Sequence, residues 1–97
     1  MTGSDLEAFL EMTGNAVTAR IRNADASDSV TTDDAVSIVL GVDTADGTHL
    51  EFIRPVDEVG PGTSWEHTWT IQGPVRHADA NVRDGSGSVL ATASADV

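Results

Sequence analysis

The chain has 97 residues with neither lysine nor cysteine, and its 16 aspartates and glutamates against five arginines give a formal net charge of −11 at pH 7. Without cysteine it has no disulfide framework, thiolate metal site or thiol nucleophile, and without lysine it has no phosphate-binding loop of the Gly-x-x-x-x-Gly-Lys type. The shortage of basic residues argues against nucleic-acid binding, which requires a positively charged surface.

So acidic a composition is typical of proteins that work in concentrated salt. A large charge of one sign repels itself and weakens the compact state. Salt at about 1 M shortens the screening length to about 3 Å and removes most of this repulsion. We therefore expect a protein from a halophilic archaeon, with a surface adapted to high salt.

The length predicts one domain over residues 1–97, because compact domains run from about 50 to 250 residues. Residues 1–5 have neither the basic nor the apolar part of an export signal. No stretch approaches the roughly 20 apolar residues that span a bilayer. The sequence as it stands predicts a cytoplasmic protein with no membrane segment; a domain excised from a longer chain fits an extracellular or cell-surface location instead.

Most of the chain alternates apolar and polar residues, which is typical of half-buried strands. Residues 4–12 are ambiguous, because Ser4 and Glu7 have capping-box spacing for a short helix while the alternation favours a strand. We favour the strand, joined by a turn at residues 13–15 to a second strand over 17–22 that ends at Asn23. The acidic stretch 24–34 has almost nothing to bury and predicts a loop.

Further strands are expected beyond this loop. One covers residues 36–42, a turn follows at 43–47, and the next strand runs through Leu50 and Phe52 and is limited by Pro55. After the break at residues 60–62, a strand over residues 65–71 carries two tryptophans on one face. A strand over 78–82, a turn at 84–87 and a strand from 88 to about 93 form a final hairpin.

Six or seven short strands with regularly spaced turns predict an all-β fold, namely a two-sheet antiparallel immunoglobulin-like sandwich, with a barrel as the alternative. The four large aromatic residues are expected to act as core fillers, so that each of them matters: Phe9, Phe52, Trp65 and Trp69.

The order of short motifs resembles the FxLYD and CARDB groups of immunoglobulin-like sandwich domains over residues 5–94. The motifs are Arg22-Asn23, Val42-Asp43 before a glycine turn at residues 44–47, the Pro-Gly step within 59–63, and the turn at 84–87. Residues 39–43 occupy the place of the Phe-x-Leu-Tyr-Asp run without matching it. The resemblance implies an accessory or adhesive module of extracellular or envelope proteins, with no shared catalytic residues.

Trp65, His67 and Trp69 share one face of their predicted strand. Facing solvent, they would form a stacking platform for a sugar ring or a cation. The polar residues between them would then fill the core, at about 1 to 3 kcal/mol for each unpaired group. We therefore interpret this face as core packing, with His67 neutral and either hydrogen-bonded to backbone or at the rim of the sheet.

The other polar residues predict no catalytic, cofactor or metal site. The three histidines fall on different predicted strands without paired spacing, so we expect no zinc site; they are His49, His67 and His77. Weak cation binding is the alternative to simple solvation at the acidic loop, whose carboxylates are Asp25, Asp28, Asp33 and Asp34. We expect Arg20 and Arg22, which share a strand face, to pair with carboxylates.

These observations favour a non-enzymatic interaction or structural module that docks an unidentified partner protein through a strand edge or through loops at one end. One alternative is the soluble domain of an archaeal cell-surface, pilus or archaellum accessory protein. Another is a module that binds a small ligand or a metal.

Overall fold

The structure is a computed structural model that describes residues 6–24, 29–31, 34–56 and 58–96. The described residues form seven strands and no α-helix: β1 (Leu6–Thr13), β2 (Ala16–Asn23), β3 (Ser37–Thr44), β4 (His49–Pro55), β5 (Ser64–Thr70), β6 (Val75–Arg83) and β7 (Val89–Asp96). Within the described part of the chain, no helix is long and apolar enough to cross a membrane.

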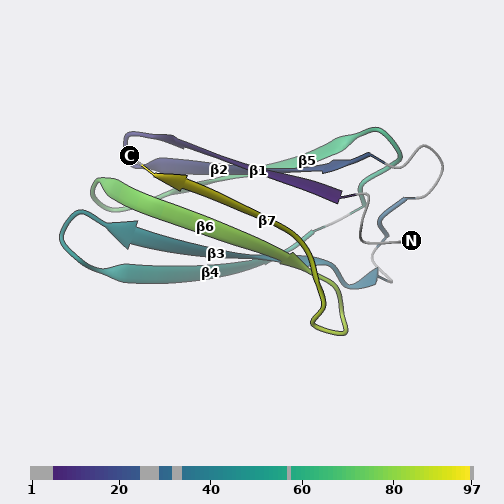
Figure 1. Cartoon of the computed structure of the whole chain (residues 1–97). Coiled ribbons are helices and arrows are strands. Elements are labelled where there is room, and N and C mark those ends of the chain that lie inside the picture. Colours follow the sequence, from purple (N-terminus) through teal and green to yellow (C-terminus); the bar gives the residue numbers. More distant parts are fainter. Residues whose placement is uncertain (1–5, 25–28, 32–33, 57, 97) are drawn as a thin grey trace.

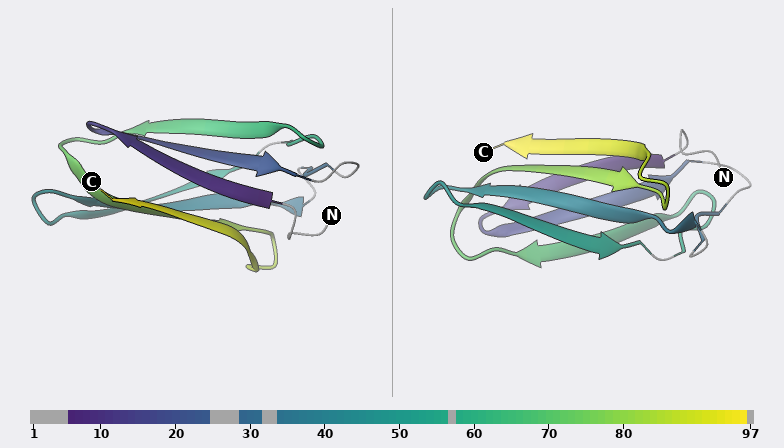
Figure 2. Two further views of the ribbon diagram at one scale, coloured as in Figure 1. Left: turned by 45° about the horizontal axis from the view of Figure 1, so that its top comes forward. Right: turned by 90° about the horizontal axis from the view of Figure 1, so that it is seen from below.

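The strands pair antiparallel in two sheets, ordered β1-β2-β5 and β4-β3-β6-β7 (Figure 1). The sheets lie face to face as two layers in the views of Figure 2. The chain crosses between them after β2, after β4 and after β5. The predicted all-β, two-sheet antiparallel sandwich is therefore confirmed, with seven strands.

The ambiguous N-terminal segment is a strand over its described residues. β1 pairs with β2 along its whole length, and the two-residue turn between them begins at Gly14 with φ of 61°. Glycine adopts this positive φ without steric cost, as the first position of such a hairpin turn requires. The strand and its turn are confirmed, while Ser4, on which the helical alternative depended, lies outside the described residues.

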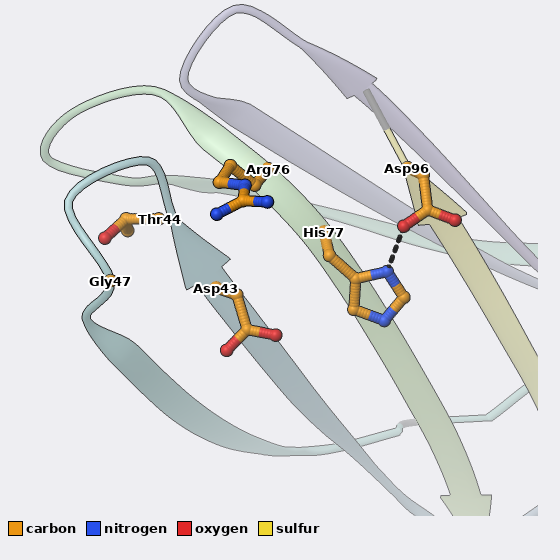
Figure 3. Close-up of a pocket in the computed structure, with 6 residues that line it drawn as sticks. All are labelled: Asp43, Thr44, Gly47, Arg76, His77 and Asp96. Carbon is orange, nitrogen blue, oxygen red and sulfur yellow. Dashed lines mark hydrogen bonds and ion pairs between the residues drawn. The ribbon is translucent and has the colours of Figure 1, made fainter.

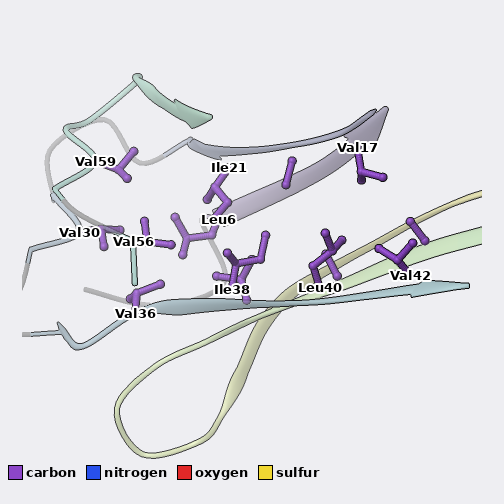
Figure 4. Packing of buried hydrophobic residues seen from close by; sticks show 14 of the residues in the cluster. Leu6, Val17, Ile21, Val30, Val36, Ile38, Leu40, Val42, Val56 and Val59 are labelled. Carbon is purple, nitrogen blue, oxygen red and sulfur yellow. The ribbon is translucent and has the colours of Figure 1, made fainter. Parts of the chain in front are cut away.

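The core lies between the sheets and consists of the inward-facing valine, isoleucine, leucine and alanine side chains of the alternating strands (Figure 4). Its largest fully buried side chains are Ile21 from one sheet and Ile38 and Leu40 from the other. Fully burying a side chain of this kind stabilises the fold by about 1.5 to 3 kcal/mol.

The aromatic residues are not the centre of this core. Phe52, Trp65 and Trp69 are partly buried and pack against its margin. The expectation for Phe9 is wrong: it lies on the outer face of the three-stranded sheet, 41% exposed, with the guanidinium carbon of Arg20 4.8 Å from its ring centroid. Leu6, Ala8 and Leu10 of β1 point into the core, so Phe9, which lies between Ala8 and Leu10, must point outward.

The loop after β2 also differs from its prediction, because it does contribute to the core. Val30 is fully buried and exchanges two backbone hydrogen bonds of 2.9 Å with Val59 in the β4–β5 connection. The pair closes one end of the sandwich (Figure 4). Val30 can be buried in an otherwise polar loop because its backbone N–H and C=O groups are hydrogen-bonded to the opposite loop.

Three strands extend beyond their predicted ends. β6 begins at Val75, three residues before its predicted start, while β3 continues to Thr44 and β7 to Asp96, both into polar sequence. The outward residues near the ends of β3 and β7 are held by pairing between strands, since Asp43 stands opposite His77 and His77 opposite Asp96, whereas Thr44 at the end of β3 is buried. This extension places charged side chains on the outer face of the four-stranded sheet.

Candidate interaction face

The outer face of the four-stranded sheet carries a row of alternating histidines and aspartates, one from each strand. Strand register aligns His49 of β4 with Asp43 of β3, Asp43 with His77 of β6, and His77 with Asp96 of β7. Successive residues of a strand point to opposite faces, so these four side chains share the face that points away from the core.

Each histidine of the row is paired with an aspartate. Nδ1 of His49 lies 2.7 Å from Oδ1 of Asp43, and Nδ1 of His77 lies 2.5 Å from Oδ1 of Asp96 (Figure 3). An ionised carboxylate only accepts hydrogen bonds, so Nδ1 carries the proton and donates in both pairs. These hydrogen bonds are the main reason that the pKa values of His49 and His77 are raised above their usual range.

A depression of about 570 Å³ lies at the end of this row, beside the β3–β4 turn (Figure 3). Its lining residues include charged side chains but no large hydrophobic one: Asp43, Thr44, Gly47, Arg76, His77 and Asp96. Without a hydrophobic or aromatic side chain in its wall, it lacks the main feature of a small-molecule pocket.

A second depression, of about 340 Å³, is centred on Gly41 in the next row of the same face. Register places Gly41 between Glu51 of β4 and Asp79 of β6. A Cβ atom added to Gly41 would lie 2.5 Å from Oδ1 of Asp79 and 3.4 Å from Cε1 of His49. The missing side chain therefore lets a carboxylate and an imidazole approach the sheet from the two neighbouring strands.

Apolar side chains adjoin this depression in the following row. Ile53 of β4 stands opposite Val39 of β3, and both line the depression together with Asn81 and Arg83. Ile53 is 73% exposed. Three large hydrophobic residues are exposed in the described part of the chain, and two of them, Ile53 and Val89, lie on this face.

The face is predominantly negative. The four strands carry four carboxylates and two guanidinium groups on this face or lining its depressions, which are Asp43, Glu51, Asp79, Asp96, Arg76 and Arg83. Glu51 lies 3.7 Å from Nε2 of His49. Asp79 and Arg83 form no ion pair with any other described side chain, although the charge of Asp79 helps to raise the pKa of His77.

The two tryptophans of β5 lie on the inner face of the three-stranded sheet, toward the core, and not on the outer face of the four-stranded sheet. Trp65 and Trp69 pack against buried residues, and His67 lies between them at ring-centroid distances of 6.2 and 4.7 Å. Burial, and secondarily the charge of Arg54, lowers the pKa of His67. The interpretation of this face as core packing is confirmed, with His67 half-buried on an edge strand, and the lowered pKa of His67 favours its neutral form.

The three histidines do not converge. His49 and His77 lie on the outer face just described, whereas His67 lies on the inner face of the other sheet. Within the described ranges, no group of three or more histidine and acidic side chains is placed to hold a metal ion. Of the acidic-loop residues, only Asp34 is described; Asp25, Asp28 and Asp33 lie outside the described residues.

The two arginines of β2 behave differently from each other. Arg22 pairs with Glu7 at 2.8 Å, as predicted. Arg20 stacks on Phe9 and, among the described residues, forms no ion pair, so the prediction for Arg20 is wrong. An aromatic ring directly opposite in the register competes with carboxylates for its planar guanidinium.

Sequence reasoning did not find the histidine–aspartate row or the depression over Gly41. The sequence did contain one signal for this face, namely the residues that alternate with the buried ones in β3, which contains Leu40, and in β4, which contains Phe52. Their outward direction follows from the alternation, but their neighbours depend on strand register, which the alternation does not give.

Comparison with known proteins supports the fold alone. No protein-family model matches the sequence, and no curated protein matches it. The structure is similar to part of the crystal structure of Bacteroides uniformis beta-glucuronidase, with a TM-score of 0.56 and 10% sequence identity. The match covers 93% of this chain but only 12% of the beta-glucuronidase chain, so it is confined to a small region of that much longer protein.

Proposed function

We propose that this chain is a non-enzymatic protein-interaction module, an immunoglobulin-like sandwich of the FxLYD/CARDB kind suited to concentrated salt. It docks a partner protein on the outer face of its four-stranded sheet. The observation that carries this proposal is the exposed Ile53 beside Val39, at the margin of the depression over Gly41. Such a combination of an apolar contact and a concavity rimmed by charge is typical of a protein interface.

The dimensions of the face suit a partner segment. Strands about 4.8 Å apart make a four-stranded sheet about 19 Å wide. A helix of about 10 to 12 Å diameter or an extended segment fits within that width. Covering Ile53 completely would contribute about 1.5 to 3 kcal/mol, and polar contacts around it would set the specificity.

The face is a better docking site than most of the strand edges. β1 and β7 lie side by side, so each restricts access to the edge of the other (Figure 2). β4 carries Glu51 and Arg54 and ends at Pro55, features that discourage strand addition. The edge of β5 is the remaining site for the strand-edge docking predicted from the sequence.

The similarity to a segment of a longer protein supports a modular role. A sandwich of this size makes up 12% of the beta-glucuronidase chain, which shows that the fold occurs as one part of a larger architecture. At 10% identity, neither the activity nor the substrate of that protein extends to this chain.

Affinity capture with matched surface variants tests the proposal. The folded protein is used as bait at about 1 M salt, where the screening length of about 3 Å suppresses non-specific attraction to its charge. Wild type is compared with Ile53→Ser and with Phe9→Ser, which removes an exposed apolar residue from the outer face of the other sheet. We expect a protein retained by wild type and Phe9→Ser but lost with Ile53→Ser. Equal retention by all three baits would contradict docking on this face.

A further inference from the structure

We infer that the partner presents a basic side chain and, about 6.6 Å away along its own chain, an aliphatic one, with the basic group seated over Gly41 between Glu51 and Asp79 and the aliphatic group on Ile53 and Val39. This inference rests on the proposed function and specifies the chemistry of the partner.

The position over Gly41 suits a cation. Glu51 and Asp79 line the depression from the two neighbouring strands, and because Gly41 has no Cβ atom the Asp79 carboxylate lies close to the sheet, beneath the position of the cation. Asp79 has no ion-pair partner among the described residues, so a guest cation does not have to displace one. A guanidinium or ammonium group at this position would make charge-assisted hydrogen bonds, which are about twice as strong as neutral ones.

The apolar contact lies at a fixed spacing from the cation position. Val39 precedes Gly41 by two residues in β3, and Ile53 follows Glu51 by two residues in the antiparallel β4, so the two lie in one row. Two residues of a strand span about 6.6 Å, which is also the distance between side chains i and i+2 of an extended segment. A segment with the pattern basic-x-aliphatic, lying along β3, therefore meets both positions at once.

The same charges disfavour a second copy of this chain as the occupant. The face carries four carboxylates against two guanidinium groups, so two copies placed face to face would oppose like charges. The net charge of −11 adds to this repulsion at low salt, whereas at about 1 M salt, with a screening length of about 3 Å, only the charges in direct contact across the face oppose each other. Complementarity of charge therefore selects a basic partner.

The charge of the face also makes the binding sensitive to pH. His49 adjoins the depression and is faced by Asp43 from β3, Glu51 from its own strand and Asp79 from β6, with His77 next in its row. Protonation of His49 would place a positive charge beside the cation position and would occupy Glu51. We expect affinity for the basic partner to fall on acidification through the raised pKa of His49.

Peptides selected from a random display library on the folded full-length protein at about 1 M salt, where the screening length is about 3 Å, provide the probe. Each selected peptide is synthesised with arginine and with its neutral isostere citrulline, and binding is measured by calorimetry. The variants are Gly41→Ala, Asp79→Asn, Ile53→Ser and, for the dependence on pH, His49→Gln. The matched control is Glu66→Gln, which removes one carboxylate from the outer face of the other sheet and so leaves the same total charge as Asp79→Asn. Circular dichroism confirms that each variant is folded.

The expected result is a set of peptides with arginine or lysine two residues from an aliphatic residue. Their affinity should fall about tenfold with Asp79→Asn, with Ile53→Ser and with citrulline, but not with Glu66→Gln. Gly41→Ala should weaken binding as well, because its Cβ would displace the Asp79 carboxylate. Acidification should weaken binding to wild type more than to His49→Gln.

Other outcomes would overturn the inference in distinguishable ways. Peptides that bind all the face variants equally, and respond instead to changes on the edge of β5, would refute this partner chemistry while leaving an interaction module in place. Self-association of the wild-type protein that is abolished by Ile53→Ser would identify a second copy as the occupant. Failure to select any specific peptide, with the protein shown to be folded, would count against both the inference and the proposed function.

Discussion

The substitution Trp69→Ala tests whether the tryptophan face of β5 belongs to the core or forms a ligand platform. Trp69 is partly buried and packs against the core cluster. A tryptophan buries about 150 to 250 Å², which corresponds to about 4 to 6 kcal/mol at about 25 cal/mol per Å². Because Trp69 lies at the margin of the core, we expect the lower part of the range for large aromatic truncations, a loss of about 3 kcal/mol. That is a large fraction of the 5 to 15 kcal/mol, roughly, that stabilises a domain.

Urea denaturation followed by far-ultraviolet circular dichroism measures this loss. Urea is uncharged, so it leaves the screening of the acidic surface unchanged, which a guanidinium salt would not do. Glu66→Ala is the matched control, because Glu66 lies on the same strand but is exposed on the outer face. We expect Glu66→Ala to change the free energy of unfolding by no more than about 0.5 kcal/mol.

Equal stability of Trp69→Ala and wild type would refute the core assignment. If that variant also lost binding to a simple sugar that stabilises the wild-type protein, the tryptophans would form a ligand surface, and the inner and outer faces of β5 would have to be exchanged.

Three further predictions address the core, a buried polar contact and a titrating histidine. Leu40→Ala should lower the free energy of unfolding by about 2 to 5 kcal/mol and Ile53→Ala by no more than about 0.5 kcal/mol, because Leu40 is fully buried and Ile53 is 73% exposed; comparable losses in urea titrations would contradict the register of the four-stranded sheet. Asn23→Ala should cost about 1 to 3 kcal/mol, because fully buried Asn23 donates a 3.1 Å hydrogen bond from Nδ2 to a loop carbonyl, and a midpoint unchanged in the same titration would show that this contact is dispensable. An NMR titration should give His49 a pKa above its usual 6.5, and Asp43→Asn should lower that pKa. Since folding raises the pKa of His49, the stabilisation of the fold by the His49–Asp43 pair is fully present below about pH 6.5 and is lost as the pH rises through the folded-state pKa. A pKa that Asp43→Asn leaves unchanged would exclude this pairing.

The strands and the direction of their side chains were predictable because they follow from local alternation. Ala19 and Ile21 alternate with polar neighbours, and each turned out to be buried as that pattern indicates. The misplaced residues were those with unexpected partners. Phe9 lies outside the core under Arg20, and Val30 lies inside it against Val59. In each case the partner belongs to a different strand or loop, which local periodicity does not report.

The amino-acid sequence was enough to establish the acidic character of the chain, its all-β class and the division of each strand into an inner and an outer face. The candidate interaction face depended on the folded arrangement. Asp43 meets His77, and His77 meets Asp96, through pairings between segments far apart in the chain. The Asp79 carboxylate lies over Gly41 because the two residues are paired across β3 and β6. Register is set by how the buried residues of all the strands pack together, so the neighbours on the outer face are determined by a core in which they take no part.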